Sequence, residues 1–411
     1  MATSKNGSGD EQKKKLGKDL LQSVLRKSER PRNLRELGIS TLRNLPANIG
    51  MVQGLMKAIN WRLAQEEVLQ SLNNTVVIVG RPNTGKSTLF NKIKGQQLSA
   101  VSALPGSTRT LVRTDFGPFT LVDTPGIDVA QQIPNTTESG LAQASVIVML
   151  MDATNLVANR ERELYEVLKK LEKPLILAVN KVDAVDDGRS SDQIATDAAV
   201  MLGTPGVIPV SARTGLNIAE ELLPEIINAS PEAALVIGRE LPAFRRAAAQ
   251  RIIRNATLVS LAAGIEPIPF VDIPILLGTQ IRLVLRIAAL YGENMNTTEA
   301  MKYARELIVT MAGGLGFRYL AEQAAKAVPF GGDFVAGAIA AAATWSIGQV
   351  ALEYYENGRE FNPSRLRQLY KQVYARFRKD NVVQQLRDQS VDGLALESKE
   401  SLQLPERIEE K

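Results

Sequence analysis

Residues Gly80–Thr88 have the types and the order needed to surround a phosphate group. They read Gly-Arg-Pro-Asn-Thr-Gly-Lys-Ser-Thr, and they follow an apolar, β-branched run at 75–79 and precede a run with helical spacing. Glycine lets consecutive backbone N–H groups point at one phosphate, and the helix that follows adds unpaired donors and a positive dipole end. We expect Lys86 to contact the β- and γ-phosphates and the Ser87 hydroxyl to bind Mg²⁺.

Two further segments carry oxygen ligands for a metal ion. Thr108 lies in a stretch rich in Gly, Ser and Thr, where a flexible loop could bring its hydroxyl to the Mg²⁺ and the γ-phosphate and act as a switch. An apolar run at 119–122 predicts a strand that leads into Asp-Thr-Pro-Gly. At that strand end Asp123 can hold Mg²⁺ through a water molecule, and the N–H of Gly126 can contact the γ-phosphate. The predicted metal ligands are Ser87, Thr108 and Asp123.

A four-residue loop indicates which base accompanies the phosphates. Asn-Lys-Val-Asp, residues 180–183, follows a buried-strand pattern. Asp183 can accept hydrogen bonds from the ring N–H and the exocyclic amine of guanine, a pair of donors that adenine lacks. Asn180 can bond the other ring edge, and the stem of Lys181 can cover the base. The backbone of a later Ser-Ala-Arg, residues 211–213, can contact the guanine carbonyl. Together these segments predict a guanine nucleotide.

Composition limits the remaining chemistry. The 411 residues include no cysteine and no histidine, which excludes disulfides, thiolate nucleophiles, a histidine general base and the commonest zinc sites. The chemistry must use carboxylates, Lys, Arg, hydroxyls, backbone amides and a hard metal such as Mg²⁺. The net charge of +5 is modest. The polar first residues contain no apolar signal-peptide region, so we expect a cytoplasmic protein.

Five segments resemble, in their order, the motifs of translation-factor-class GTPases: Gly80–Ser87, Thr108, Asp123–Gly126, Asn180–Asp183 and Ser211–Arg213. Their sequences are most similar to those of the Era/TrmE branch. The resemblance implies an α/β P-loop GTPase domain with a doubly wound, mainly parallel sheet and the nucleotide at the carboxyl ends of its strands. The GTP-binding residues that it implies are Gly80, Arg81, Pro82, Asn83, Thr84, Gly85, Lys86, Ser87, Thr88, Asp123, Thr124, Pro125, Gly126, Asn180, Lys181, Asp183, Ser211, Ala212 and Arg213.

Catalysis is expected to depend on Lys86, Thr108, Asn83 and Gly126. Ile127 stands where Ras-like proteins carry the glutamine that positions the attacking water. Isoleucine cannot orient water by hydrogen bonding, so we expect slow intrinsic hydrolysis of GTP to GDP and phosphate. In the Era/TrmE branch an asparagine at the place of Asn83 helps to hold K⁺, which the resemblance implies as a second cofactor beside Mg²⁺. An arginine supplied in trans is the alternative source of positive charge.

The remaining segments lie on either side of this domain. We expect an α/β nucleotide domain flanked by an N-terminal helical segment and an all-α C-terminal domain. Both ends of the chain have the composition of disordered segments, basic at the start and acidic at the end. The expected boundaries are 1–15 for the basic arm, 16–73 for the helical segment, 74–230 for the GTPase domain, 240–380 for the apolar helical domain and 385–411 for the tail.

The helical half raises the question of a membrane. Residues 334–352 are uncharged and just long enough to span a bilayer, but the many Ala and Gly make their transfer into lipid marginal. A basic helix pattern at 365–379 fits an anionic membrane surface or, equally, docking on the protein itself. This half is similar to the YcjF-type helical domain, of undefined role, that follows some bacterial Era-like GTPases. That resemblance depends on Ile-Pro-Phe-Val-Asp-Ile-Pro at 268–274 and Gly-Gly-Leu-Gly at 313–316.

The leading hypothesis is a bacterial GTP-hydrolysing switch at the inner face of a membrane, held there peripherally or by shallow insertion of its helical half. Its expected partners are GTP or GDP, an anionic membrane surface and a second copy of the chain through the G domains. A second hypothesis is a soluble ribosome- or RNA-assembly GTPase that uses the basic N-terminal arm, although no RNA-binding pattern is evident. A GTP-gated adaptor with little turnover is the third.

Overall fold

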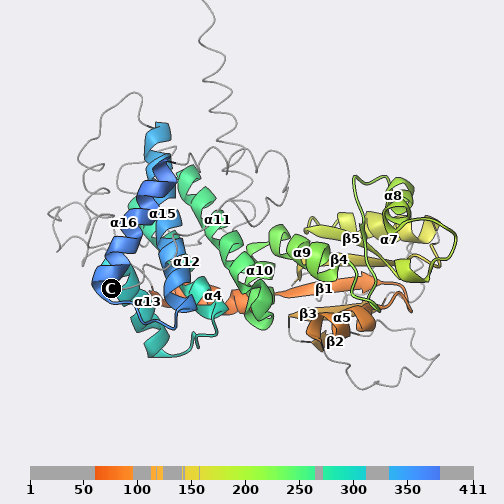
Figure 1. The fold of residues 1–411 in the computed structure, drawn as a ribbon, viewed down its shortest axis with the longest axis horizontal. Helices are drawn as coiled ribbons and strands as arrows, with labels where there is room; N and C mark the ends of the chain where they lie inside the picture. Colours follow the sequence, from red (N-terminus) through yellow and green to blue (C-terminus); the bar gives the residue numbers. More distant parts are fainter. Residues whose placement is uncertain are drawn as a thin grey trace, which may run out of the picture.

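The computed structural model describes residues 61–95, 113–116, 118–123, 141, 144–156, 158–263, 272–311 and 333–379. The expected basic arm at 1–15 and tail at 385–411 lie outside the described residues. Figure 1 shows two bodies next to each other, a sheet flanked by helices and a bundle of helices. The expected division into an α/β domain and an all-α C-terminal region is confirmed.

A six-stranded sheet forms the core of the first body. Its strands are β1 (Thr75–Gly80), β2 (Arg113–Phe116), β3 (Phe119–Asp123), β4 (Ala144–Asp152), β5 (Leu175–Asn180) and β6 (Ile208–Pro209). They lie in the order β2-β3-β1-β4-β5-β6, and each neighbouring pair is parallel except the antiparallel pair of β2 and β3. This is the mainly parallel sheet that the sequence predicts, and its five parallel strands deliver their following loops to one edge.

The central strands are apolar on both sides because helices cover both faces of the sheet. Val76 of β1 packs in one cluster with Leu89, whereas its neighbour Val77 packs in a second cluster with Leu164 and Ile194. Successive residues of a strand point to opposite faces, so this alternation places helices on each side. The helices of this body are α5 (Lys86–Lys94), α7 (Ala158–Lys169), α8 (Ser191–Leu202) and α9 (Leu223–Ala229), with short turns of helix at Val182–Ala184 and Ile218–Leu222.

The second body is a bundle of helices. They are α4 (Trp61–Leu72), α10 (Pro231–Glu240), α11 (Arg245–Ala263), α12 (Asp272–Leu290), α13 (Thr298–Met311), α15 (Asp333–Glu356) and α16 (Pro363–Lys379). The uncharged run at 334–352 lies in α15, which packs against α11, α12 and α16. A Cβ atom built on Gly348 would lie 2.8 Å from Ile253 and 3.1 Å from Leu283, so small residues let these helices approach closely. Within the described residues, no helix is both long and apolar enough to cross a membrane.

Helix α16 has two different faces. Its apolar residues Leu366, Tyr370, Val373 and Phe377 are buried against the bundle, and the Phe377 ring lies 5.9 Å from the ring of Trp345 in α15. Docking on the protein therefore accounts for the apolar face of this helix. The opposite face is exposed and basic, and Pro363–Lys379 contains no acidic residue.

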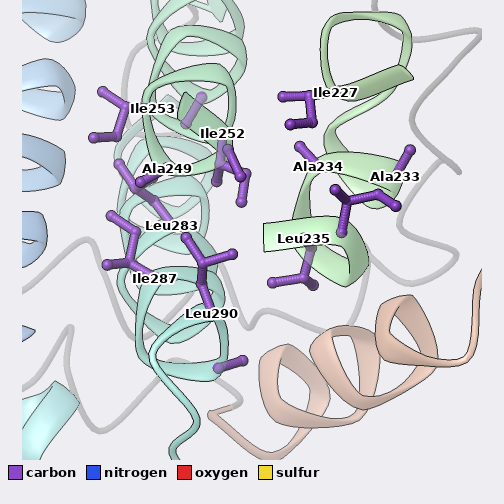
Figure 2. Packing of buried hydrophobic residues seen from close by; sticks show 14 of the residues in the cluster. Ile227, Ala233, Ala234, Leu235, Ala249, Ile252, Ile253, Leu283, Ile287 and Leu290 are labelled. Carbon is purple, nitrogen blue, oxygen red and sulfur yellow. The ribbon is translucent and has the colours of Figure 1, made fainter. Parts of the chain in front are cut away.

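The two bodies share one continuous core. Figure 2 shows side chains of α9 and α10, including Ile227 and Leu235, that face Ile252 of α11 and Leu290 of α12. Between α9 and α10 the chain turns at Ser230, whose hydroxyl accepts hydrogen bonds from the first backbone N–H groups of α10. This side-chain cap fixes the direction in which the chain leaves the sheet and enters the bundle.

Helix α4 belongs to the bundle although it precedes the sheet in the chain. It packs against α12 and α10, and it leads into β1 through only Asn73 and Asn74. On α12, Arg282 forms an ion pair with Glu67 of α4, and one turn later Arg286 pairs with Glu232 of α10 at 3.1 Å. A single helix thus holds both the segment that enters the sheet and the segment that leaves it.

Candidate functional site

Three loops meet at the carboxyl ends of the parallel strands. The loop after β1 begins at Arg81, the loop after β5 begins at Lys181, and the loop after β6 leads to Ser211. In the sheet register Gly80 pairs with Asp123, and Asp152 pairs with Asn180, so the strand ends lie level. The sheet therefore brings the predicted phosphate segment, the predicted guanine segments and Asp123 to one edge.

The loop after β1 is folded around the ammonium group of Lys86. The Nζ atom donates to the carbonyl oxygens of Gly80 at 2.9 Å and Arg81 at 2.8 Å, and it lies 3.3 Å from Oγ1 of Thr84. Asn83 and Gly85 both have positive φ, at 67° and 92°. These conformations turn the backbone so that α5 begins immediately after the loop, as a phosphate loop requires.

Gly85 cannot be replaced by a larger residue without strain. It has left-handed backbone geometry, and a Cβ atom at this position would lie 2.3 Å from Nδ2 of Asn180. The stem of Lys181 also lies over this glycine, with its Cε atom 4.0 Å from the same Cβ position. The glycine in the predicted motif thus allows the phosphate loop and the loop after β5 to touch.

Asn180 joins all three loops through its side-chain amide. Its Nδ2 donates to the carbonyl oxygen of Thr84 at 2.8 Å, and its Oδ1 accepts from the backbone N–H of Ala212 at 2.8 Å. The side chain is 1% exposed. The sequence assigns this amide to the edge of the base, and that contact stays a prediction. The structure adds a second role, because the amide fixes the spacing between the phosphate and guanine segments.

The carboxyl group of Asp183, in the predicted guanine loop, is held in its ionised form. Its carboxylate accepts from Nε of Arg213 at 2.7 Å. Burial raises its pKa, but hydrogen bonds from Ser211 and Arg213 outweigh burial and hold the pKa below its usual range. A carboxylate that stays ionised can accept from two donors at once, which is the requirement for reading guanine.

Sequence reasoning missed Asp152, which ends β4 and supports the guanine loop. Its Oδ2 accepts from Nζ of Lys181 at 2.6 Å, and its Oδ1 accepts from the backbone N–H and the hydroxyl of Thr154. Burial raises the pKa of Asp152, but these bonds more than offset it and lower the pKa overall. A carboxylate directly after a buried strand is a signal that could have identified it.

Glu161 was also missed. It lies in the first turn of α7, is 1% exposed, and faces the guanidinium of Arg81, with Oε1 and NH1 3.5 Å apart. The surrounding Arg-Glu-Arg-Glu run conceals it in the sequence. Helical spacing to the buried Leu164 and Leu168 could have placed it on the inner face of α7.

The residues expected to hold Mg²⁺ are only partly described. Ser87 is exposed in the first turn of α5, and Asp123 lies next to the start of the phosphate loop in the sheet register. Ser87 and Asp123 are residue types that suit Mg²⁺, which prefers a few oxygen ligands beside substrate phosphates. Among the described residues, no group of three acidic residues forms an all-protein metal site. Thr108, Thr124, Pro125, Gly126 and Ile127 lie outside the described residues.

Two family models match the chain. Residues 75–181 match the family described as 50S ribosome-binding GTPase, and residues 232–379 match a domain of unknown function, DUF697. The first range includes β1 to β5 and ends at Lys181, before Asp183, and the second includes α11 to α16 and nearly all of α10. The second match begins just after the turn between α9 and α10, and residues 182–231 lie between the two matches.

Curated relatives include proteins named GTPase Der. The protein from Moorella thermoacetica is 34% identical over 210 residues, which cover 48% of this chain and 46% of that protein. Those from Desulforamulus reducens and Alkaliphilus metalliredigens are each 38% identical, over 165 and 172 residues, which cover 36% and 38% of those proteins. The chain thus spans less than half the length of these relatives.

Solved structures with a similar region include a probable GTP-binding protein engB, which is 24% identical and has a TM-score of 0.30. That match covers 38% of this chain and 97% of the other. The G domain of the Thermotoga maritima FeoB iron transporter is 25% identical, with a TM-score of 0.26, over 38% of this chain and 96% of the other. The Era/TrmE branch stays a prediction. From the family models and the site geometry, the chain carries a P-loop GTPase domain followed by a helical DUF697 domain.

Proposed function

We propose that this chain binds GTP and hydrolyses it to GDP and phosphate as a molecular switch. The observation that carries the proposal is the amide of Asn180, which ties the loop around Lys86 to the loops of Asp183 and Ser211. The phosphate segment and the guanine segments can bind one nucleotide together only when the distance between them matches the length of that nucleotide. The contact between Gly85 and Asn180 sets that separation.

Each part of the site has a distinct task in this proposal. The loop backbone and Lys86 bind the phosphates and place positive charge where negative charge develops during transfer. The ionised carboxylate of Asp183 selects guanine. Mg²⁺, when held by Ser87, Asp123 and the expected ligand Thr108, neutralises phosphate charge. The N–H of Gly126 is expected to sense the γ-phosphate.

Replacement of Asp183 by Asn tests the base assignment. The change replaces one of the two accepting oxygens by an NH₂ donor, which would face a donor of guanine, so affinity for GTP should fall about 100-fold or more. The new amide can donate to the carbonyl that xanthine carries at this position, so xanthosine triphosphate should bind better than GTP. Asp186→Asn, at an exposed position three residues later, is the matched control. Equal GTP affinity in wild type and D183N, measured with a fluorescent nucleotide, would refute the proposal.

The source of catalytic charge is a separate part of the proposal. We expect slow intrinsic hydrolysis because of Ile127, with K⁺ near Asn83 as the assisting cation. Asn83 already has the left-handed conformation, with φ 67°, that turns this part of the loop. Hydrolysis should be faster in KCl than in NaCl at equal ionic strength. Equal rates would remove Asn83 and K⁺ from the mechanism, and no hydrolysis with either salt would favour a GTP-gated adaptor.

The exposed face of α16 supports attachment to an anionic membrane surface. Arg365, Arg367, Lys371 and Arg376 are exposed on a helix that has no acidic residue. The apolar face of the helix is already buried, so the proposed attachment is peripheral and electrostatic, at the inner face of a bacterial membrane. Such contacts contribute about 1 kcal/mol for each basic residue near the surface and weaken as salt screens them.

Vesicle sedimentation tests this attachment with the full chain. Changing Arg365, Arg367 and Lys371 to Glu should weaken binding to vesicles rich in anionic lipid by about 100-fold or more. Changing Arg160, Lys169 and Lys170, which are exposed in or next to α7, is the matched control. Wild-type binding that is equal on neutral and anionic vesicles would refute an electrostatic attachment.

A ribosome partner is the second candidate, because the matching family model is described as a 50S ribosome-binding GTPase. Sedimentation of the full chain with 50S subunits, in GTP and in GDP, tests this candidate. Comigration only with GTP would favour it, and comigration with neither nucleotide would reject it. Light scattering under the same conditions tests the proposed dimer of G domains.

A further inference from the structure

Glu161 is a buried acid with an unusual environment. It is 1% exposed, yet neither carboxylate oxygen has a hydrogen-bond partner. The nearest opposite charge is the guanidinium of Arg81, with NH1 3.5 Å from Oε1, and Arg81 itself is only partly exposed. A buried carboxylate with so little support is costly, since removing it from water is not repaid by hydrogen bonds.

The charges around Glu161 act on that cost in opposite directions. Burial raises the pKa of Glu161, the positive charge of Arg81 opposes the rise, and the nearby Asp152 adds to it. Asp152 is itself committed to Lys181 of the guanine loop. Arg81 is therefore the group that favours the ionised form of Glu161, and the two side chains depend on each other.

Arg81 is also the centre of the phosphate loop. Its carbonyl oxygen accepts from Nζ of Lys86 at 2.8 Å, from Oγ1 of Thr84 at 3.0 Å and from the backbone N–H of Thr84 at 3.3 Å. Three bonds that close the loop thus converge on one carbonyl. Whatever fixes the position of residue 81 fixes the loop around Lys86.

We propose that Glu161 is a positioning residue for the phosphate loop, which it holds in the binding conformation by anchoring the side chain of Arg81 from α7. The inference deepens the proposed GTP binding and rests on it. Glu161 does not touch the nucleotide in this account. It fixes the loop in the conformation that binds phosphate, and its buried carboxylate, which has no hydrogen bonds, lowers the stability of the protein.

If Glu161 has this role, the change Glu161→Gln should affect GDP affinity and protein stability in different ways. Affinity for GDP should fall about tenfold, which corresponds to about 1.4 kcal/mol, because Arg81 loses its charged anchor. Stability of the nucleotide-free protein should stay equal or rise, because a buried charge without hydrogen bonds is removed while the partly exposed Arg81 can still be solvated. A residue needed only for folding would lower both quantities. Glu161→Asp keeps the charge and should recover part of the affinity.

Titration with a fluorescent GDP analogue, together with urea unfolding without nucleotide, measures both quantities. Glu163→Gln, an exposed neighbour on α7, is the control and should match wild type in each. Arg81→Gln should reproduce the loss of affinity, and the double variant with E161Q should lose little more than either single change. Two results would overturn the inference: the fold-losses in GDP affinity of the two single variants multiply in the double variant, or E161Q binds GDP as tightly as the wild type. In either case the proposed function stands, provided that the wild type binds GDP. A wild-type protein that binds no GDP would overturn both.

Discussion

Replacing Asn180 by Ala should destabilise the protein even when no nucleotide is present. The change leaves the carbonyl of Thr84 and the N–H of Ala212 without their partner, at residues that are 2% and 4% exposed. A buried polar group without a hydrogen bond costs about 1–3 kcal/mol, so the two groups predict a loss of about 2–6 kcal/mol. Asn180→Asp should cost at least as much, because its second oxygen would face the Thr84 carbonyl.

Urea unfolding of the nucleotide-free protein, followed by circular dichroism, measures this loss. The midpoint should fall while the dependence on urea stays the same, which would show that stability changed and compactness did not. Asn159→Ala is the matched control, because Asn159 is exposed in the first turn of α7. If N180A loses less than about 0.5 kcal/mol, a typical value for surface changes, the amide does not tie the loops together and our account of the site is wrong.

Three further variants probe other contacts. Gly85→Ala should abolish GDP binding, measured by titration, because its Cβ would lie 2.3 Å from Asn180 at a φ of 92°. Gly238→Ala should lower the free energy of unfolding by about 1–3 kcal/mol, the usual cost of overpacking, because its Cβ would lie 2.5 Å from an alanine Cβ on α11. Asp152→Asn should lose the ion pair with Lys181. Since the folded-state pKa of Asp152 is lowered, its stabilisation is fully present above pH of about 4 and disappears as pH falls through the lower folded value. The urea midpoint of D152N should therefore lie below that of the wild type at neutral pH, and the two midpoints should approach each other only in acid.

The loops of the site were predictable because their information is local. A β-branched run followed by glycines and Lys86 describes a strand, a turn and a helix within a few residues, and the structure has this order. The partners of Asn180 were not predictable in the same way. Its two bonds reach Thr84 and Ala212, far away along the chain, and they exist only because β1, β5 and β6 end at one edge. Glu161 was hidden for the same reason, since its partner lies on another strand's loop.

The apolar run at 334–352 shows the opposite limitation. Its length suggested a membrane, and its many small residues suggested close packing, and the sequence alone could not decide. In the structure α15 lies in the middle of the bundle, where Thr344 and Gln280 bond through their side chains. Helix packing, which depends on where α11 and α12 lie, determines the role of such a run.

The bundle is assembled from two separate lengths of chain, and the nucleotide domain is in effect an insert between them. Arg282 and Arg286 of α12 hold the two junctions close together, through Glu67 before the insert and Glu232 after it. A fragment that starts at residue 74 would therefore lack a piece of the other domain and leave a face of α12 bare. Conversely, a linker that joined α4 directly to α10 would expose the sides of α10 and α11 that pack on the sheet and on α9. The helical domain of unknown function is therefore best studied in the full chain, with both α4 and the nucleotide domain present.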